Sequence, residues 1–136
     1  MKKLTWWLRI VGGFYLLLGV MNVVVSFFAP QFATEFVFPS SYTVDEVVVR
    51  TFIHANLPPT LAWIVLGVIM FYASRELANA KIIVFTVAML ELFTWVPYDV
   101  LWFVNGLPGA VGAPFLVIHI AIAVTGILFL RQAQAE

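Results

Sequence analysis

Four apolar stretches dominate this sequence, and each is long enough to cross a bilayer, which takes about 20 helical residues. They cover Leu4–Ala29, Val44–Tyr72, Ala80–Val104 and Gly112–Leu130. Only 10% of the residues are charged, against about a quarter in an ordinary soluble domain. So few charges cannot cover the surface of a soluble globule of this size. We therefore expect an all-α integral membrane protein, in which residues 1–136 form a single domain with a four-transmembrane-helix bundle.

The charges between the apolar stretches predict how the bundle is oriented. The basic residues outside the stretches or at their ends lie at the N-terminus, around the second connection or near the C-terminus: Lys2, Lys3, Arg75, Lys81 and Arg131. The first and third connections, Pro30–Thr43 and Asn105–Val111, contain no Lys or Arg. Because cytoplasmic loops carry the excess of these residues, we expect both termini to be cytoplasmic.

The two ends of the first stretch raise separate questions. Its start is similar to a signal peptide, but Arg9 interrupts the apolar region and Phe28–Gln31 is a poor cleavage site. We therefore expect a retained span. The connection that follows carries several aromatic side chains, which suit an anchored loop in the membrane interface better than a lid over a ligand. These are Phe32, Phe36, Phe38 and Tyr42.

Local capping patterns predict where two of the helices begin. Thr43 and Glu46 have the spacing of a capping box, in which the Thr43 hydroxyl accepts from the Glu46 amide and the Glu46 carboxylate accepts from the Thr43 amide. The second span is therefore expected to begin near Val44. Pro114 suits the first turn of the fourth span, where its missing N–H costs nothing.

Prolines and glycines within the spans predict bends and close approaches. Pro58, Pro59 and Pro97 cannot donate to the carbonyl one turn earlier, so the second and third spans are expected to be bent or broken. Such backbone is stable at membrane depth only in a protein interface or beside a watery cavity, and the sequence leaves both possibilities open. Gly12 and Gly19 share one helix face, which favours close packing against a neighbouring helix.

Ionisable and amide side chains also lie inside the spans, where they normally face the bundle interior and find partners. At a rise of about 1.5 Å per residue, Arg50 is about 9 Å and His54 about 15 Å from the start of their span. Glu91 is about 15 Å from the start of its own span, near the level of His54. All four spans are thus expected to contribute to one polar layer in the outer half of the bilayer, through Glu91, His54, Arg50, Asp99, His119 and Asn22.

One face of the third span combines a carboxyl group with large aromatic rings. Glu91, Trp95, Tyr98 and Trp102 recur at spacings of four, three and four residues, which predicts a single helical stripe. The aromatic members of the stripe either fill the core and anchor the helix, or contact a ligand. Glu91 itself is expected to be protonated, paired with a basic neighbour or poised for proton transfer.

Each of the other ionisable residues has a simple structural interpretation. Arg50 and Asp99 are at matching heights and are expected to form an internal ion pair that fixes the helix register. His54 and His119 are expected to be neutral and hydrogen-bonded to a freed carbonyl or to an asparagine.

Several kinds of site receive no support. Without cysteine the chain forms no disulfide, thiolate metal site or cysteine nucleophile. No local spacing of His with carboxylates predicts a metal site, and no phosphate loop or dinucleotide fingerprint identifies a cofactor. The net charge is zero and the chain has no basic run, so nucleic acid is not an expected partner.

The segment Trp6–Tyr15, with the letters WWLRIVGGFY, continues through Gly19 to Asn22. This opening resembles that of small bacterial four-span proteins of the BphX-like and DoxX-like groups. The resemblance extends over the chain in span number, length and the closing helix from His119 to Arg131. It implies a multi-pass protein of the bacterial inner membrane, in a group sometimes associated with aromatic-compound or redox metabolism. It brings no catalytic residues with it.

These patterns favour a protein that binds a small hydrophobic ligand with a polar head, such as a quinone, an aromatic compound or a lipid. In this hypothesis Glu91, His54 and Arg50 recognise the head, and Trp95 and its aromatic neighbours on the stripe hold the ring or tail. One alternative is a non-catalytic accessory subunit or assembly factor that binds other membrane protein subunits. Another is a proton-transfer enzyme, either an isomerase or a quinone-linked oxidoreductase, in which Glu91 and His54 exchange protons.

Overall fold

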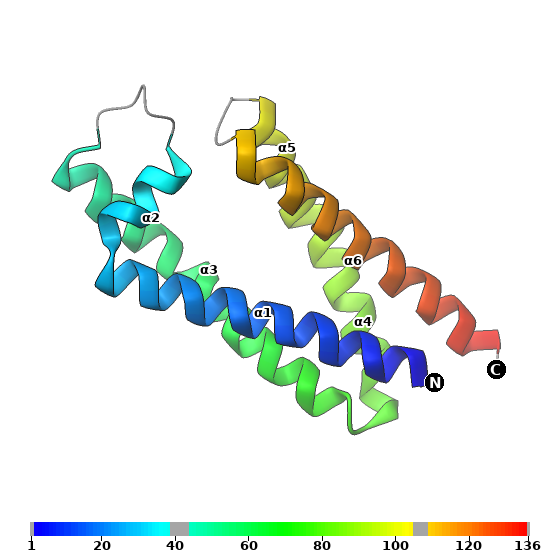
Figure 1. Ribbon diagram of the computed structural model, residues 1–136. Coiled ribbons are helices and arrows are strands. Elements are labelled where there is room, and N and C mark those ends of the chain that lie inside the picture. Colours follow the sequence, from blue (N-terminus) through cyan, green and yellow to red (C-terminus); the bar gives the residue numbers. More distant parts are fainter. Residues whose placement is uncertain (1, 39–43, 105–108, 136) are drawn as a thin grey trace.

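The computed structural model describes residues 2–38, 44–104 and 109–135, and the secondary structure within these ranges is helical (Figure 1). In chain order the elements are α1 (Lys2–Phe28), α2 (Pro30–Val37), α3 (Glu46–Ala73), α4 (Leu77–Leu90), the π-helical turn η1 (Glu91–Trp95), α5 (Val96–Val104) and α6 (Gly109–Ala135). Four stretches of helix are long and apolar enough to cross a membrane: Lys2–Phe28, Glu46–Ala73, Asn79–Val104 and Ala113–Ala133. The prediction of an all-α chain with four helices of spanning length is confirmed.

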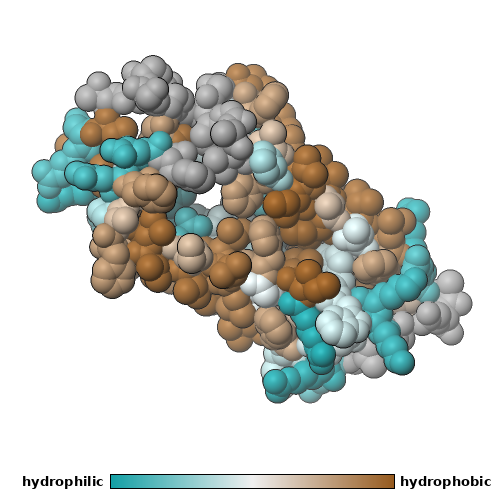
Figure 2. All heavy atoms as spheres, viewed as in Figure 1, coloured by the Kyte–Doolittle hydropathy of each residue, from teal (hydrophilic) through white to brown (hydrophobic). Residues whose placement is uncertain are grey.

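The helices form two pairs that diverge along the bundle. α1 packs along α3, and the path from α4 through α5 packs along α6. Figure 1 shows the pairs close together at the end that holds both termini and well apart at the end that holds α2. In Figure 2 apolar residues cover the long middle of the molecule, and hydrophilic residues gather toward its two ends. Phe93 and Val104, for example, are 76% and 75% exposed. Such large apolar exposure is what lipid-facing helices require.

Glycines set the close contact between α1 and α3. A Cβ atom added at Gly67 would lie 2.8 Å from the carbonyl oxygen of Gly12, and one at Gly12 would lie 3.1 Å from the carbonyl oxygen of Gly67. Farther along the same contact, a Cβ at Gly19 would lie 2.5 Å from Cγ1 of Ile64. The two backbones can approach this closely only because these positions carry no side chain. The prediction that Gly12 and Gly19 serve helix packing is confirmed.

The hydrophobic core occupies the end of the bundle that holds the termini. It is built from the first half of α1, the last turns of α3, α4 and the last half of α6. Its buried members include Leu8, Tyr15, Met70, Val84 and Ile122. The Trp7 indole N–H donates to Oγ1 of Thr125 at 2.9 Å and connects α1 to α6 within this region. All four long helices are therefore joined at this end.

The start of α3 differs from the predicted capping box. The N-cap is Asp45, whose carboxylate accepts a 2.8 Å hydrogen bond from the amide of Val48. Glu46 is the first helical residue, and its carboxylate binds a side chain one turn later. Thr43, the predicted cap, lies outside the described residues, as does Tyr42. Aspartate caps a helix at least as well as threonine does, and the helix begins two residues later than the predicted start at Val44.

The connection after α1 is not simply a loop, because Pro30–Val37 forms the short helix α2. Pro30 occupies its first turn, where a missing N–H is not needed. The buried Thr34 hydroxyl donates back to the carbonyl of Gln31 at 2.8 Å, which satisfies it within the helix. Phe32 is exposed, and Phe38 meets Phe52 of α3 edge-on with 5.7 Å between ring centroids. This segment is therefore a helix that contacts α3 instead of the predicted loop, and its place in the membrane interface stays a prediction.

The bends or breaks predicted at the prolines have different outcomes in the second and third spans. α3 continues through Pro58 and Pro59 without a break. In the third span the helix widens instead into η1, where the amide of Val96 donates to the carbonyl of Glu91, five residues earlier. Pro97 follows directly and cannot make the normal bond to the carbonyl of Phe93. The extra residue in this turn rotates everything after it relative to α4.

Candidate functional site

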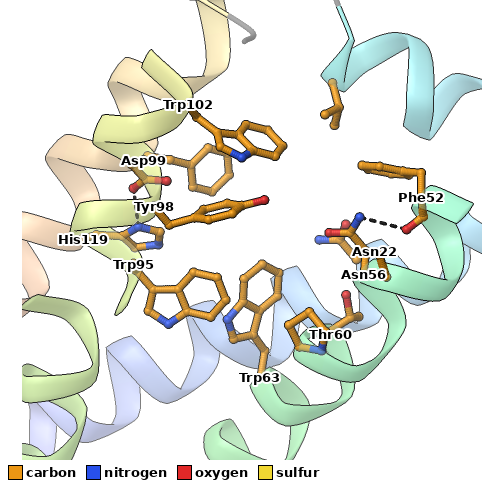
Figure 3. Close-up of a pocket in the computed structure, with 14 residues that line it drawn as sticks. Asn22, Phe52, Asn56, Thr60, Trp63, Trp95, Tyr98, Asp99, Trp102 and His119 are labelled. Carbon is orange, nitrogen blue, oxygen red and sulfur yellow. Dashed lines mark hydrogen bonds and ion pairs between the residues drawn. The ribbon is translucent and has the colours of Figure 1, made fainter. Parts of the chain in front are cut away.

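A cavity of about 430 Å³ lies between the two diverging helix pairs (Figure 3). Its size falls within the range that suits small organic ligands. Residues from α1, α2, α3, η1, α5 and α6 contribute to it: Asn22, Val37, Phe52, Ala55, Asn56, Pro59, Thr60, Trp63, Trp95, Tyr98, Asp99, Trp102, Phe115 and His119. The prediction of a polar cavity shared by all four spans therefore corresponds to a real cavity, but with a different set of side chains.

One wall carries a buried acid and base in contact. Nδ1 of His119 on α6 lies 2.6 Å from Oδ2 of Asp99 on α5. The two residues are only 4% and 7% exposed. Aspartate here fixes the orientation of the imidazole ring, as carboxylates commonly do for histidines at functional sites. Within the described part of the chain nothing hydrogen-bonds Nε2, so this ring nitrogen is available to a ligand.

The opposite wall carries neutral polar groups. The side-chain amide of Asn56 donates to the carbonyl of Phe52 at 2.9 Å, and that of Asn22 donates to the carbonyl of Leu18 at 3.0 Å. Each amide thus keeps its oxygen and a second N–H for other partners. Figure 3 shows both amides on the side facing Tyr98, with Thr60 nearby. Pro59 also frees the carbonyl of Ala55, a residue that lines the cavity.

Aromatic rings connect the two polar walls. The rings of Trp63 and Trp95 have centroids 5.0 Å apart, as do those of Tyr98 and Trp102. Trp95 also lies 5.9 Å from the imidazole of His119. These tilted arrangements leave flat ring faces beside the open space, which is the surface that another planar ring packs against. Three of the four rings belong to the predicted aromatic stripe.

One of these aromatic side chains carries an unmatched polar atom. Among the described residues, the buried indole Nε1 of Trp63 has no hydrogen-bond partner. A buried donor without an acceptor costs about 1–3 kcal/mol relative to a satisfied one. Trp63 borders the cavity, but its Nε1 atom is itself buried and is not exposed to the open space.

Glu91 does not line the cavity, contrary to its predicted place on the aromatic stripe. It is fully buried in the packed half of the bundle, where the hydroxyl of Tyr15 donates to its Oε1. Its Oε2 has no hydrogen-bond partner among the described residues. The reason for the error is η1, which begins at Glu91: the widened turn separates this side chain from the face shared by Trp95 and the residues after it.

Arg50 and His54 are also corrected. Arg50 Nη2 binds Oε1 of Glu46 at 2.6 Å on the same helix, with both side chains largely exposed, so it forms no ion pair with Asp99. His54 is exposed on α3 and does not line the cavity. For both residues the prediction used the height along the helix, which does not determine the direction in which a side chain points. Asp99 instead pairs with His119, which was expected to bind a carbonyl or an asparagine.

Several cavity residues were missed, and the sequence did contain a signal for them. Phe52, Asn56, Pro59 and Trp63 recur on α3 at spacings of four, three and four residues. This is the same pattern that identified the stripe on the third span. The two stripes face each other across the cavity. Contributions from α2, such as Val37, carried no such signal.

Within the described ranges, no three His, Asp or Glu side chains come together as a metal site. Asp99 and His119 therefore have no third side chain of this kind beside them to complete a metal site.

No model of a protein family, no curated protein sequence and no solved structure matches this chain.

Proposed function

We propose that this chain is a multi-pass protein of the bacterial inner membrane, with both termini cytoplasmic, that binds a small aromatic molecule bearing hydroxyl or carbonyl oxygens. The four apolar helices support the membrane location, and the opening segment Trp6–Tyr15 supports a relationship to the BphX-like and DoxX-like groups. The cavity between α3 and α5 is the binding site. The observation that carries the proposal is the buried Asp99–His119 pair bordering an aromatic cavity.

The chemistry of the walls selects the ligand. Flat rings of tryptophan and tyrosine favour a planar, apolar body. With Asp99 accepting from Nδ1–H, the His119 ring presents Nε2 as an acceptor to a hydroxyl group. The amides of Asn22 and Asn56 provide hydrogen bonds at the other side. A quinol or a phenolic compound satisfies all three requirements, whereas a purely aliphatic molecule satisfies none.

Two naphthalene derivatives of similar shape test this proposal. Dihydroxynaphthalene with hydroxyls at opposite ends is compared with the corresponding dimethylnaphthalene, by quenching of tryptophan fluorescence in the purified full chain. We expect the dihydroxy compound to bind at least tenfold more tightly, because only it can hydrogen-bond to the walls. Equal affinity for the two compounds would show that the cavity accepts any apolar ring and would refute polar recognition.

A pair of matched substitutions locates the binding site. Asp99→Asn removes the charge that orients His119, so we expect about a tenfold loss of affinity for the dihydroxy compound. Glu91→Gln makes the same chemical change in a buried carboxyl outside the cavity, and we expect less than a twofold change. If Glu91→Gln weakened binding as much as Asp99→Asn, the cavity would not be the site.

The 2.6 Å contact between Asp99 and His119 also favours a second candidate, proton transfer to and from the bound ligand. In this reaction the hydroxyl proton moves to Nε2 of His119 and leaves an oxyanion on the ligand. The absorbance of bound dihydroxynaphthalene would then shift toward that of its anion in the native protein and not in His119→Phe. An unshifted spectrum in the native protein would leave binding as the only role.

A further inference from the structure

A second hollow lies on the outside of the bundle, between the first half of α1 and the last half of α6. It encloses about 540 Å³. The residues that line it are Lys2, Lys3, Trp6, Trp7, Ile10, Val11, Ile118, Ala121, Ile122, Thr125 and Phe129. Figure 1 shows these two helix segments side by side at the end that holds both termini. The groove shares no residue with the cavity, although the two adjoin on α6, where Ile118 lines the groove and His119 lines the cavity.

The groove is apolar because its few polar groups are satisfied internally. The indole N–H of Trp7 donates to Thr125, and the Thr125 hydroxyl donates in turn to the carbonyl of Ala121 at 2.6 Å. Gly126 allows this packing, since a Cβ there would lie 3.0 Å from Cζ2 of Trp7. Trp6 and Ile10 are more than half exposed and form the rim on α1. Such a surface favours a hydrocarbon chain over any polar ligand.

The dimensions of the groove match one leaflet of a bilayer. From Ile118 to Phe129 the α6 wall extends about 16 Å at the helical rise of about 1.5 Å per residue. Half of a hydrocarbon core of about 30 Å is about 15 Å. An acyl chain that enters at the membrane surface would therefore run the full length of the groove and end near mid-membrane.

The end of the groove nearest the membrane surface is basic. Lys2 and Lys3 line it, and Nζ of Lys3 donates to Oε1 of Gln132 at 3.0 Å, which holds that ammonium group beside α6. Arg131 on α6 is also exposed there. A phosphate group at the head of a chain in the groove would meet these cations, and each cation near a membrane surface contributes about 1 kcal/mol, or about fivefold in affinity.

We infer that this groove binds a phospholipid with an anionic headgroup, with one acyl chain between α1 and α6 and the phosphate at Lys2 and Lys3. The site does not depend on the ligand of the cavity. Length and charge identify the occupant together. A membrane-spanning helix of a partner would continue past mid-membrane, and a zwitterionic lipid carries a cation beside its phosphate that the lysines would repel. The bound lipid would hold α1 and α6 together where the groove leaves a gap in their packing.

The test compares phosphatidylglycerol with phosphatidylcholine carrying the same acyl chains, added to the delipidated full chain and detected by native mass spectrometry. We expect phosphatidylglycerol to be retained preferentially. Lys2→Gln/Lys3→Gln should reduce this preference by about 25-fold, from two cations at about fivefold each. Ala121→Phe, which fills the groove at an exposed position, should reduce retention of both lipids.

Arg75→Gln is the matched control for charge. Arg75 is exposed at the same end of the bundle, after α3, but does not line the groove. Lys2→Gln alone removes the same single charge from within the groove, so it should lower retention of phosphatidylglycerol about fivefold while Arg75→Gln changes it little. Equal retention of the two lipids by the native chain would overturn the inference. An equal effect of Lys2→Gln and Arg75→Gln would also overturn it, since binding would then follow total charge.

Discussion

The two ends of this bundle are made from the same four apolar helices, yet one end is filled and the other is hollow. Near the termini, side chains from all four spans interlock in the core around Leu8, Met70 and Val84. Near α2, the pair α1 and α3 diverges from α5 and α6, and the space between them is lined by aromatic and polar groups. Buried polar residues occur in both ends, so polarity alone does not distinguish a structural site from a binding site. The difference lies in whether the polar group borders open space.

The largest loss of stability is expected from a substitution that adds one carbon atom between α1 and α3 in the filled end. Gly67→Ala places a Cβ 2.8 Å from the carbonyl oxygen of Gly12, and neither backbone can move without separating the helices. We expect the free energy of unfolding to fall by about 2–3 kcal/mol. Gly13→Ala is the control, because its Cβ would meet only Phe71, at an ordinary 3.8 Å. Unfolding in a denaturing detergent measures both, and equal stability of the two variants would contradict this account.

The next largest effect is expected at the buried polar contact of the filled end. Tyr15→Phe removes the hydroxyl that donates to Glu91, which leaves that fully buried carboxyl without a described donor. We expect a loss of about 1–2 kcal/mol in the free energy of unfolding. Tyr72→Phe removes a hydroxyl from a tyrosine that is 63% exposed and should change stability little. Affinity for dihydroxynaphthalene should stay within twofold in both variants, since neither tyrosine lines the cavity.

The hollow end should show the opposite behaviour, with large effects on binding and small effects on stability. Ala55→Leu adds three carbons to a residue that lines the cavity. We expect at least a tenfold loss of affinity for dihydroxynaphthalene and a change in unfolding free energy below about 0.5 kcal/mol, because the added atoms enter existing space. A variant that unfolds easily would indicate that this end is packed after all.

The smallest effect is expected for Arg50, whose partner distinguishes the predicted arrangement from the observed one. Its contact with Glu46 is an exposed pair within one helix, for which about 0.3–0.5 kcal/mol is typical. Arg50→Gln should therefore change stability by no more than that and leave ligand affinity unchanged. A loss of several kcal/mol in thermal unfolding would instead indicate that Arg50 neutralises a buried acid.

The four long helices could be predicted because a helix that crosses a bilayer needs a long uninterrupted apolar stretch, and four such stretches are visible in the sequence. The helical rise grouped several of the polar residues at one level, although it placed Glu91 among them wrongly. Asn22, Asp99 and His119 were accordingly placed in the correct half of the bundle, and Trp95, Tyr98 and Trp102 on one face.

The pairing of those residues could not be predicted, for two physical reasons. Depth does not determine direction around a helix axis, so Arg50 and His54 were assigned to the interior although they face outward. The π-helical turn then shifted the direction of Glu91 relative to Trp95, and no residue type marks such a turn except Pro97 downstream. The divergence of the two helix pairs could not be predicted either, because it depends on tertiary packing and not on any local sequence pattern.

The widened turn η1 has a consequence for insertions and deletions in the gene. Removing any one residue from 91–95 would allow a continuous α-helix from Leu77 to Val104, in which Pro97 would still lack the hydrogen bond to the carbonyl four residues earlier. The segment beyond the deletion would then be turned by about 100° against its surroundings. Asp99 would leave His119, although every codon downstream still specified the same amino acid. The fold of this chain therefore depends on the number of residues in the segment 91–95 as much as on which residues these are.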